Sequence, residues 1–139
     1  MNYPWSVFII KPDAVERRKI AEILLRLEGC DFKITAMKLV MPDVFQLHEH
    51  YKEHRGKDFF PALIESMCDK WIVVGQTTYL PAPEQSVPKL RAVTGCINPP
   101  PPGTIRGDFA IDFRRNSFHA SDSSEAAYRE FHIWFPELT

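Results

Sequence analysis

Residues 5–13 read Trp-Ser-Val-Phe-Ile-Ile-Lys-Pro-Asp, and this stretch decides the fold. Its apolar run, residues 5–10, is short and almost continuous, which is typical of a central strand buried on both faces of a sheet. Lys11 follows where this strand leaves the sheet, at an edge where ligand sites commonly open. A solvated lysine before a turn is the alternative interpretation. Pro12 and Asp13 predict that turn and lead toward a helix.

Apolar periodicity and turn residues divide the remaining chain into alternating strands and helices. In chain order the predicted elements are a strand at 5–10, a helix at 19–28 ended by Gly29 with positive φ, a strand at 32–41, short helices opened by Asp43 and Asp58, a strand at 71–80, a helix at 84–93, a strand ending near 118 and a helix at 124–131. This order is the β-α-β-β-α-β ferredoxin-like pattern with one helix doubled. We therefore expect an α/β (α+β) sandwich in which a four-stranded antiparallel sheet carries helices on its faces.

Length and composition predict one ordinary globular domain over residues 1–139. The chain is 45% hydrophobic and 25% charged, with a net charge of −1 and a pI near 6.5. This balance argues against a general nucleic-acid binder, so any phosphate site needs locally placed cations. The sequence has no membrane-spanning apolar run and no signal pattern at its start. Three cysteines without a C-x-x-C pair predict reduced thiols and a cytoplasmic location.

A long segment without clear periodicity, residues 94–115, lies between the predicted helix at 84–93 and the strand that ends near residue 118. Its four consecutive prolines, Pro99 to Pro102, favour a stiff, extended polyproline II path. One interpretation is a rigid linker. A long ordered loop inside a domain is more often functional, and we expect this one to shape a site.

The stretch Arg115–Ser123, Arg-Asn-Ser-Phe-His-Ala-Ser-Asp-Ser, carries the candidate chemistry. Asp122 and a glutamate three residues later fit the capping pattern that opens a helix. His119 would then end a strand just ahead of a helix N-terminus, where an anion such as phosphate is favoured. Glu130 is placed to hold one imidazole nitrogen in a fixed tautomer. A half-buried structural histidine beside a simple cap is the alternative.

Three further histidines, His48, His50 and His54, raise the question of a metal site. The zincin pattern H-E-x-x-H is not met, because position 52 is lysine. We expect a solvated helical face here and no protein-bound metal.

Five separate motifs together resemble the nucleoside diphosphate kinase family, in the right order and at nearly the right spacings from about residue 8 to residue 135. They are Lys11-Pro-Asp-Ala, His50-Tyr51, Phe59-Phe60, Asn98-Pro99 followed by Pro102-Gly-Thr-Ile-Arg-Gly-Asp-Phe109, and Arg115-Asn116 through His119-Ala-Ser-Asp-Ser123.

The resemblance implies a ping-pong exchange in which the γ-phosphoryl group of a nucleoside triphosphate passes to a nucleoside diphosphate through a phosphohistidine. It makes His119 the nucleophile and Glu130 its orienting partner. The side chains that it places around the phosphates and the ribose are Lys11, Tyr51, Arg91, Arg106 and Asn116. Phe59, with Leu63 behind it, would stack on the base.

The resemblance also implies Mg²⁺ carried by the nucleotide phosphates, with no protein cage for the metal. The implied partners are nucleoside diphosphates and triphosphates, with no membrane and no specific nucleic acid. A cytoplasmic homo-oligomer is expected, with a hexamer favoured over a tetramer or dimer.

Several positions depart from the family pattern. Ile97 stands where a threonine usually binds phosphate, and the aligned segment before Arg91 needs an insertion. Ala120 replaces the usual glycine after the histidine. The alternative function is therefore a family-like nucleotide-binding or scaffold protein with weak or no kinase activity. A nucleic-acid-binding module of the same fold is a second alternative, which the near-neutral charge disfavours.

Overall fold

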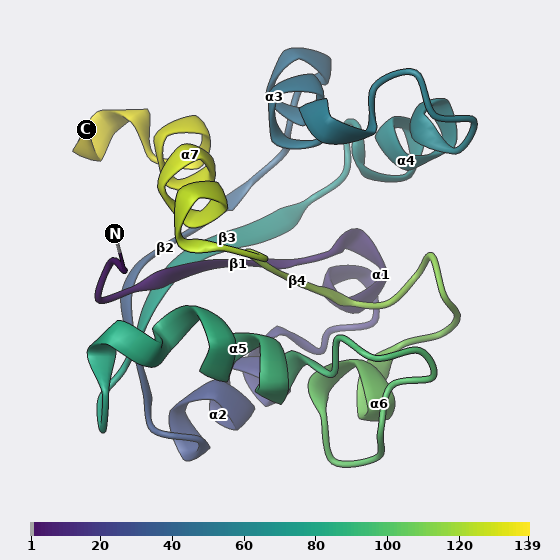
Figure 1. The fold of residues 1–139 in the computed structure, drawn as a ribbon. Helices are drawn as coiled ribbons and strands as arrows, with labels where there is room; N and C mark the ends of the chain where they lie inside the picture. The colour runs from purple at the N-terminus through teal and green to yellow at the C-terminus, as the bar shows by residue number, and fades with distance from the viewer. Residues whose placement is uncertain (1) are drawn as a thin grey trace.

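One four-stranded sheet organises residues 2–139, the part of the chain that the computed structural model describes (Figure 1). Its strands are β1 (Ser6–Ile10), β2 (Phe32–Val40), β3 (Ile72–Tyr79) and β4 (Phe118–Ala120). Their order across the sheet is β2-β3-β1-β4, and every neighbouring pair is antiparallel. The predicted ferredoxin-like sheet is confirmed.

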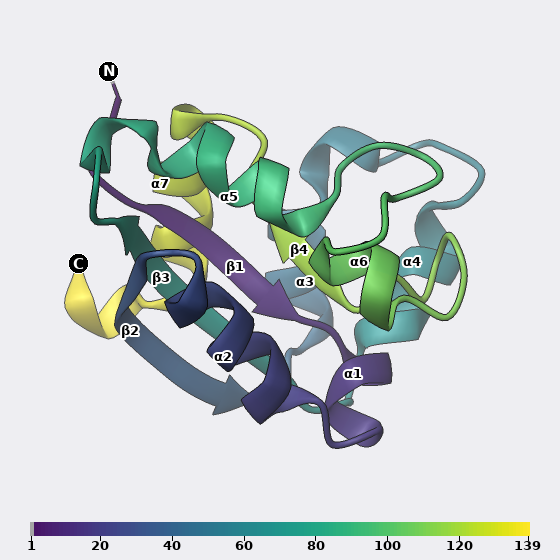
Figure 2. The ribbon, with the colours of Figure 1, turned by 90° about the horizontal axis from the view of Figure 1, so that it is seen from below.

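Helices cover both faces of this sheet. They are α1 (Pro12–Glu16), α2 (Ile20–Gly29), α3 (Val44–His50), α4 (Phe60–Met67), α5 (Ser86–Thr94), α6 (Ile105–Phe109) and α7 (Ser124–Trp134), with 3₁₀ turns η1 (Lys52–His54), η2 (Pro83–Gln85) and η3 (Pro136–Leu138). The two ribbon views agree that α2 and α5 lie on one face and that α3 and α7 lie on the other (Figure 1, Figure 2). The doubled helix of the sequence pattern is the pair α3 and α4.

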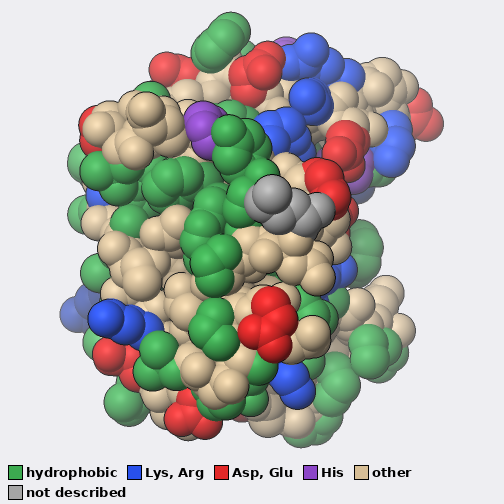
Figure 3. Space-filling model, turned by 60° about the vertical axis from the view of Figure 1, so that its left-hand side comes forward, with side chains coloured by type: hydrophobic (Ala, Val, Ile, Leu, Met, Phe, Trp, Pro, Cys, Tyr) green, Lys and Arg blue, Asp and Glu red, His purple; other side chains and the backbone are tan. Residues whose placement is uncertain are grey.

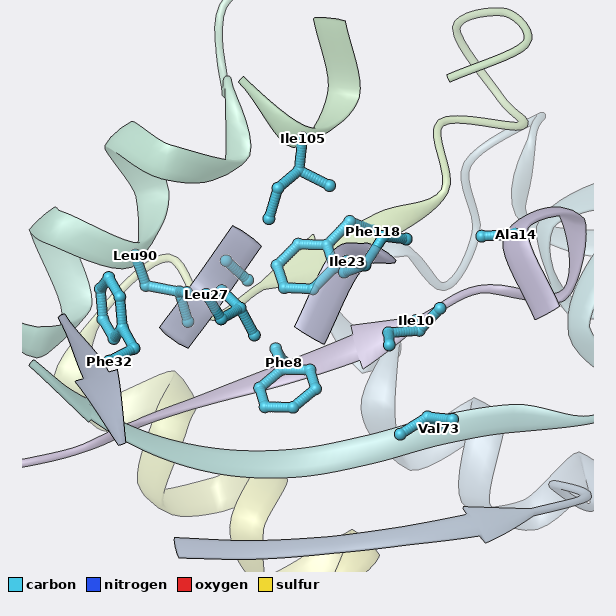
Figure 4. Packing of buried hydrophobic residues seen from close by; sticks show 11 residues of the cluster. Phe8, Ile10, Ala14, Ile23, Leu27, Phe32, Val73, Leu90, Ile105 and Phe118 are labelled. Carbon is cyan, nitrogen blue, oxygen red and sulfur yellow. The ribbon is translucent and has the colours of Figure 1, made fainter. Parts of the chain in front are cut away.

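The central strand β1 is buried along its whole length, as its apolar run predicts. Because side chains alternate along a strand, Phe8 and Ile10 point into the core beneath α2 and α5, whereas Ile9 joins the core beneath α3 and α7 (Figure 4). The Phe8 ring stacks on Phe118 of β4, with centroids 5.6 Å apart. Gly75 of β3 makes room for this ring, since a Cβ there would lie 2.2 Å from it.

Helix starts are only partly as predicted. Asp43 caps α3 through a complete capping box with Gln46. The predicted caps at Asp58 and Asp122 are wrong. Among the described residues no side chain caps α4, and α7 is capped by Ser123, whose Oγ accepts a backbone N–H of the first turn at 3.0 Å. The pattern Ser-Asp-Ser offers three candidate caps in a row, and local sequence does not distinguish them.

Two loops also differ from prediction. Gly29 is still helical, and the positive φ that follows α2 falls on Asp31, at 68°. The segment 94–115 is not irregular throughout, because Thr104 accepts the Gly107 N–H at 3.1 Å and caps α6. This helix begins only after the proline run, at Ile105.

The surface mixes apolar and charged side chains. Figure 3 shows basic and acidic side chains interspersed on one face, around a gathering of hydrophobic ones. Within residues 2–139, none of the helices combines the length and the apolar character needed to cross a membrane.

Candidate active site

The short strand β4 carries His119 at its centre, between the buried Phe118 and Ala120. Alternation along the strand sends Phe118 into the core beneath α2 and α5, and it sends His119 to the opposite face, toward α7. There Nε2 of His119 lies 2.7 Å from Oε1 of Glu130. The side chain of His119 stays 20% exposed, so the predicted pair exists and remains accessible.

Glu130 is buried on α7, with 3% of its surface exposed. Burial alone would raise its pKa, but the charge and hydrogen bond of His119 outweigh this effect, and the pKa falls to about 2. The group is therefore a carboxylate at neutral pH. A carboxylate accepts the Nε2–H of the imidazole, so that in the neutral ring the lone pair lies on Nδ1 of His119.

Ser121 belongs to the same site, and sequence reasoning treated it only as part of a cap. Its buried hydroxyl donates to Oε1 of Glu130 at 2.8 Å, and its Oγ lies 3.3 Å from the Val7 carbonyl oxygen. A signal was present in the sequence. Ser121 lies two residues after His119 in an extended segment, and residues so spaced point to the same face.

A second histidine, His50, packs against the first. It is buried rather than part of a solvated face, so that prediction is wrong for this residue. Its Nδ1 accepts the Trp134 indole N–H at 3.1 Å, and its ring centroid lies 4.7 Å from that of His119, at 72°. Burial, and then the neighbouring His119, lowers the pKa of His50 to about 3. The ring is therefore neutral at neutral pH.

Potential metal-ligand atoms of His50, His119 and Glu130 all lie within 4.8 Å of one another. Hydrogen bonds already engage these groups, since the indole holds Nδ1 of His50 and the carboxylate holds Nε2 of His119. An acceptor Nδ1 also places the proton of His50 on Nε2, where a metal would require a lone pair. The arrangement favours a hydrogen-bonded network over a metal centre.

Lys11 lies at the exit of β1, as the sequence predicts, and it is nearly buried, with 9% of its surface exposed. Its Nζ donates to Oδ1 of Asn116 at 3.1 Å, which brings two predicted site residues together. Burial is the main cause, and repulsion by Arg106 the second, of a pKa lowered to about 8, while Asp13 opposes the change. A buried ammonium of this kind favours an incoming anion.

Arg106 and Arg91 hold backbone carbonyl groups of β4. Nε of Arg106 donates to the Phe118 carbonyl oxygen at 3.0 Å, and Nη1 of Arg91 donates to that of Ala120 at 3.2 Å. These two carbonyl groups flank His119 along the strand. Both cations are thereby anchored beside the histidine, and Arg91 is placed there despite the altered segment that precedes it.

The Tyr51 hydroxyl is buried and has no hydrogen-bond partner within residues 2–139. Burial, and then the charge of Glu130, raises the pKa of Tyr51 above its usual value, so the hydroxyl keeps its proton. A buried donor without a partner is costly in a folded protein. The hydroxyl is therefore available as a hydrogen-bond donor.

Two cavities adjoin these residues. A cavity of about 170 Å³ lies over His119 and Glu130 and is lined also by Tyr51, Arg91 and Arg129. A second cavity, of about 370 Å³, lies between the proline-rich loop and the segment around α6. Its lining residues include Ile97, Arg106, Asn116, Cys96 and Phe113.

Phe59 and Leu63 are not among the residues that line either cavity. Phe59 precedes α4 and is 40% exposed, with Lys57 Nζ 5.7 Å from its ring centroid, whereas Leu63 packs partly against the core. The structure therefore gives Phe59 an accessible aromatic surface and leaves its base-stacking role a prediction. Ile97 is 68% exposed. Its side chain has no hydrogen-bonding group, so it cannot replace the phosphate contact that the family's usual threonine would make.

The model of one protein family, nucleoside diphosphate kinase, matches residues 5–139. The chain belongs to this family. It is 42% identical over 135 residues to the nucleoside diphosphate kinase of Caldanaerobacter subterraneus subsp. tengcongensis, which covers 96% of this chain and 94% of that protein. It is also 42% identical over 128 residues to the Saccharomyces cerevisiae enzyme, covering 91% of this chain and 81% of the relative.

Solved structures of nucleoside diphosphate kinases have the same fold. The Aquifex aeolicus protein superposes with a TM-score of 0.87 at 30% identity, over 96% of both chains. The Encephalitozoon cuniculi protein gives a TM-score of 0.87 at 29% identity, over 94% of this chain and 88% of its own. Family membership confirms the resemblance drawn from the five motifs, and with it the predicted function of a nucleoside diphosphate kinase.

Proposed function

We propose that His119 is the nucleophile of a ping-pong exchange between nucleoside triphosphates and diphosphates. The observation that carries this proposal is the 2.7 Å contact between Nε2 of His119 and Glu130, which leaves the Nδ1 lone pair for attack. An N–P bond forms at Nδ1 while the bond from the γ-phosphorus to the bridging oxygen breaks. The electron pair of that bond leaves with the diphosphate. A second diphosphate then takes the phosphoryl group by the reverse steps.

The groups around His119 suit this chemistry. Glu130 offsets the positive charge that the imidazole gains when it is phosphorylated. Lys11, Arg106 and Arg91 supply charge for the phosphate oxygens, and arginine can bind such oxygens bidentately. Phosphoryl transfer requires little of a protein beyond this positioning and charge.

The remaining predicted ligands have less specialised roles. The unpartnered hydroxyl of Tyr51 is a donor for a phosphate oxygen, and the Asn116 amide is a donor for a phosphate or a ribose oxygen. Phe59, supported by Leu63, is the stacking surface for the base. Stacking tolerates every base because each has a π-face, which fits exchange among many nucleotides.

Mg²⁺ is the metal that we assign to the nucleotide. Mg²⁺ prefers oxygen ligands at octahedral positions, and the group formed by His50, His119 and Glu130 offers two imidazoles and one carboxylate. The cationic donors of the site suit phosphate oxygens instead. When bound with the nucleotide, the metal would neutralise phosphate charge, and this chain's own residues would hold and orient the phosphates.

The test is incubation of the purified protein with γ-labelled ATP and Mg²⁺, followed by intact mass and acid-lability measurements. We expect one acid-labile phosphoryl group per chain, chased by GDP or CDP and absent in His119→Ala. His132→Ala is the matched control, because His132 is an exposed histidine of α7, and it should label like the wild type. Label that persists in His119→Ala would refute the assignment.

A scaffold with weak activity remains the second candidate, and one observation favours it. Ile97 presents an exposed apolar side chain to the larger cavity. Ile97→Thr should then restore a missing phosphate contact and raise kcat/KM at least tenfold if that contact limits the enzyme, since one hydrogen bond to a charged group contributes about 1.5–3 kcal/mol. An unchanged kcat/KM would remove this ground for the scaffold interpretation.

We also propose a homo-oligomer, with a hexamer favoured by the family resemblance over a tetramer or dimer. The support from this chain is the outer edge of β2, which ends the sheet and carries the exposed side chains of Met37 and Leu39, close in sequence to the exposed Phe45. Unpaired strand edges and apolar patches favour association. Sedimentation should show a particle of several 16.1 kDa chains, and Met37→Lys should shift it toward smaller species.

We propose a cytoplasmic location because the cysteines form no disulfide in the structure. Cys30, Cys68 and Cys96 are all free in the structure. Free thiols without a disulfide suit a reducing compartment. Fractionation of the source cells with an antibody to this chain would test the location.

A further inference from the structure

Ser117, two residues before His119, has an unusual backbone conformation. Its φ is +72°, and among residues 2–139 the other non-glycine residues with positive φ are Arg18, Asp31 and Asp69. Those three are exposed, whereas Ser117 is completely buried. A buried serine held in a left-handed conformation is strained, and such strain persists only where the surroundings impose it.

The surrounding hydrogen bonds show what imposes this conformation. The Phe118 N–H donates to the Asn116 carbonyl oxygen at 2.9 Å, which closes a γ-turn of the strained, positive-φ type around Ser117. Asp13 holds the turn at two points. Its Oδ1 accepts the Ser117 N–H at 3.2 Å, and its Oδ2 accepts the Ser117 hydroxyl at 2.6 Å.

Arg17 also binds both Ser117 and Asp13, which lie far apart in the sequence. Nη2 of Arg17 donates to Oγ of Ser117 at 3.0 Å and to Oδ2 of Asp13 at 3.2 Å. The side chain of Asp13 is 8% exposed, so its bonds to Ser117 are largely shielded from water. Asp13, in the turn after β1, therefore holds Ser117, just before β4 and 104 residues further along the chain.

Both neighbours of Ser117 contact cations of the proposed phosphate site. Oδ1 of Asn116 accepts from Nζ of Lys11 at 3.1 Å. The Phe118 carbonyl oxygen accepts from Nε of Arg106 at 3.0 Å. A change of φ at Ser117 would rotate these two acceptors relative to each other, and the two cations would move with them.

We propose that Ser117 and Asp13 are positioning residues for phosphoryl transfer, because their contact holds a strained γ-turn that sets Lys11 and Arg106 beside His119. The inference rests on the proposed role of His119. Neither Ser117 nor Asp13 needs to touch the nucleotide. Their effect is on the rate of transfer from a bound nucleotide, through the placement of the two cations.

Two substitutions of Ser117 separate this role from simple packing. Ser117→Ala removes the hydroxyl and keeps the cost of positive φ, whereas Ser117→Gly removes the hydroxyl and the cost together. We therefore expect Gly to rescue what Ala loses. In single-turnover labelling with γ-labelled ATP at saturation, Ser117→Ala should slow the rate constant about 10- to 100-fold. Ser117→Gly should stay within about threefold of the wild type.

Ser86 provides the matched control. It is equally buried, accepts the Tyr79 N–H at 2.9 Å and donates to the Pro83 carbonyl oxygen at 2.7 Å, but its φ is −57°. There Ala should be tolerated better than Gly, because glycine weakens a helix. Both Ser86 variants should keep the wild-type rate constant, with the Gly variant unfolding at the lower urea concentration.

The rate constant is the deciding readout, because loss of folded protein lowers the amplitude of labelling and leaves the rate constant unchanged. A Ser117→Ala rate constant equal to the wild type, or a Gly variant as slow as Ala, would overturn the proposal. Absence of label on the wild-type protein would instead overturn the proposed function.

Asp13→Asn provides a second test of the proposal if Ser117→Ala does not fold. It retains an acceptor for the Ser117 N–H but loses the charge that faces Arg17. It should slow transfer in the wild type and slow it less in the Ser117→Gly background, where the turn needs no clamp. An equal effect in both backgrounds would contradict the proposal.

Discussion

Lys11 destabilises the folded protein in the absence of nucleotide. Its pKa falls from 10.5 to about 8, chiefly because the ammonium is buried and secondly because Arg106 repels it. At 1.36 kcal/mol per pKa unit, the folded state disfavours the charged form by about 3 kcal/mol. Because the folded pKa lies below the unfolded one, this penalty is complete below about pH 8 and disappears as the pH rises toward 10.5.

Lys11→Met removes the charge and keeps a long, unbranched side chain. The variant loses the hydrogen bond to Asn116, which contributes about 1 kcal/mol. At pH 7 we therefore expect it to be more stable than the wild type by about 2 kcal/mol. The wild type should recover about 1 kcal/mol of this difference between pH 7 and pH 9. The kcat/KM for phosphoryl transfer should fall at least tenfold in the variant, because the positive charge that would face the phosphates is lost.

Urea unfolding at pH 7, 8 and 9, at one protein concentration, measures this difference. Lys33→Met is the control, because Lys33 lies exposed on β2. Its stability difference from the wild type should stay constant over the same interval. A Lys11→Met protein that is less stable than the wild type at pH 7, or a difference that does not narrow toward pH 9, would refute the assignment of a buried, penalised ammonium.

Three further predictions concern the neighbouring side chains. Glu130→Gln should slow labelling of the nucleophilic histidine at least tenfold in single-turnover assays, because a neutral amide stabilises the phosphorylated ring less; an unchanged rate would contradict this role. In calorimetry, Phe59→Ala should weaken the binding of all four common nucleotides to a similar extent. Phe45→Ala, on the exposed face of α3, should leave this binding unchanged. A loss confined to one base would contradict simple stacking. Trp134→Phe should lower the free energy of urea unfolding by about 1–3 kcal/mol, because it leaves the buried Nδ1 of His50 without a donor; an unchanged value would argue against that bond.

Local sequence patterns predicted the sheet and the contact between His119 and Glu130. The run at residues 5–10 identified the central strand because a strand buried on both faces must be apolar at consecutive positions. His119 and Glu130 are eleven residues apart, on a strand and the helix that follows it. Such a short connection leaves few ways to arrange the two, so the spacing alone was informative.

Contacts between distant segments were not predictable from local patterns. His50 looked like one member of a polar helical face, but its environment is set by Trp134, 84 residues later. Ser117 looked like the end of a strand, and its conformation is set by Asp13. In both cases the deciding partner lies on another element, which only the folded sheet brings close.

The site holds several groups in states that the free protein disfavours. The Lys11 ammonium is buried with a lowered pKa, and the Tyr51 hydroxyl is buried without a partner. Ser117 is strained beside both cation anchors. On the proposed mechanism, a bound phosphate would relieve the first two costs, since it would pair with the ammonium and accept from the hydroxyl. Under this proposal, binding energy from phosphate would be used where the phosphoryl group is transferred, and the strained turn would hold the two cations in position before the nucleotide arrives.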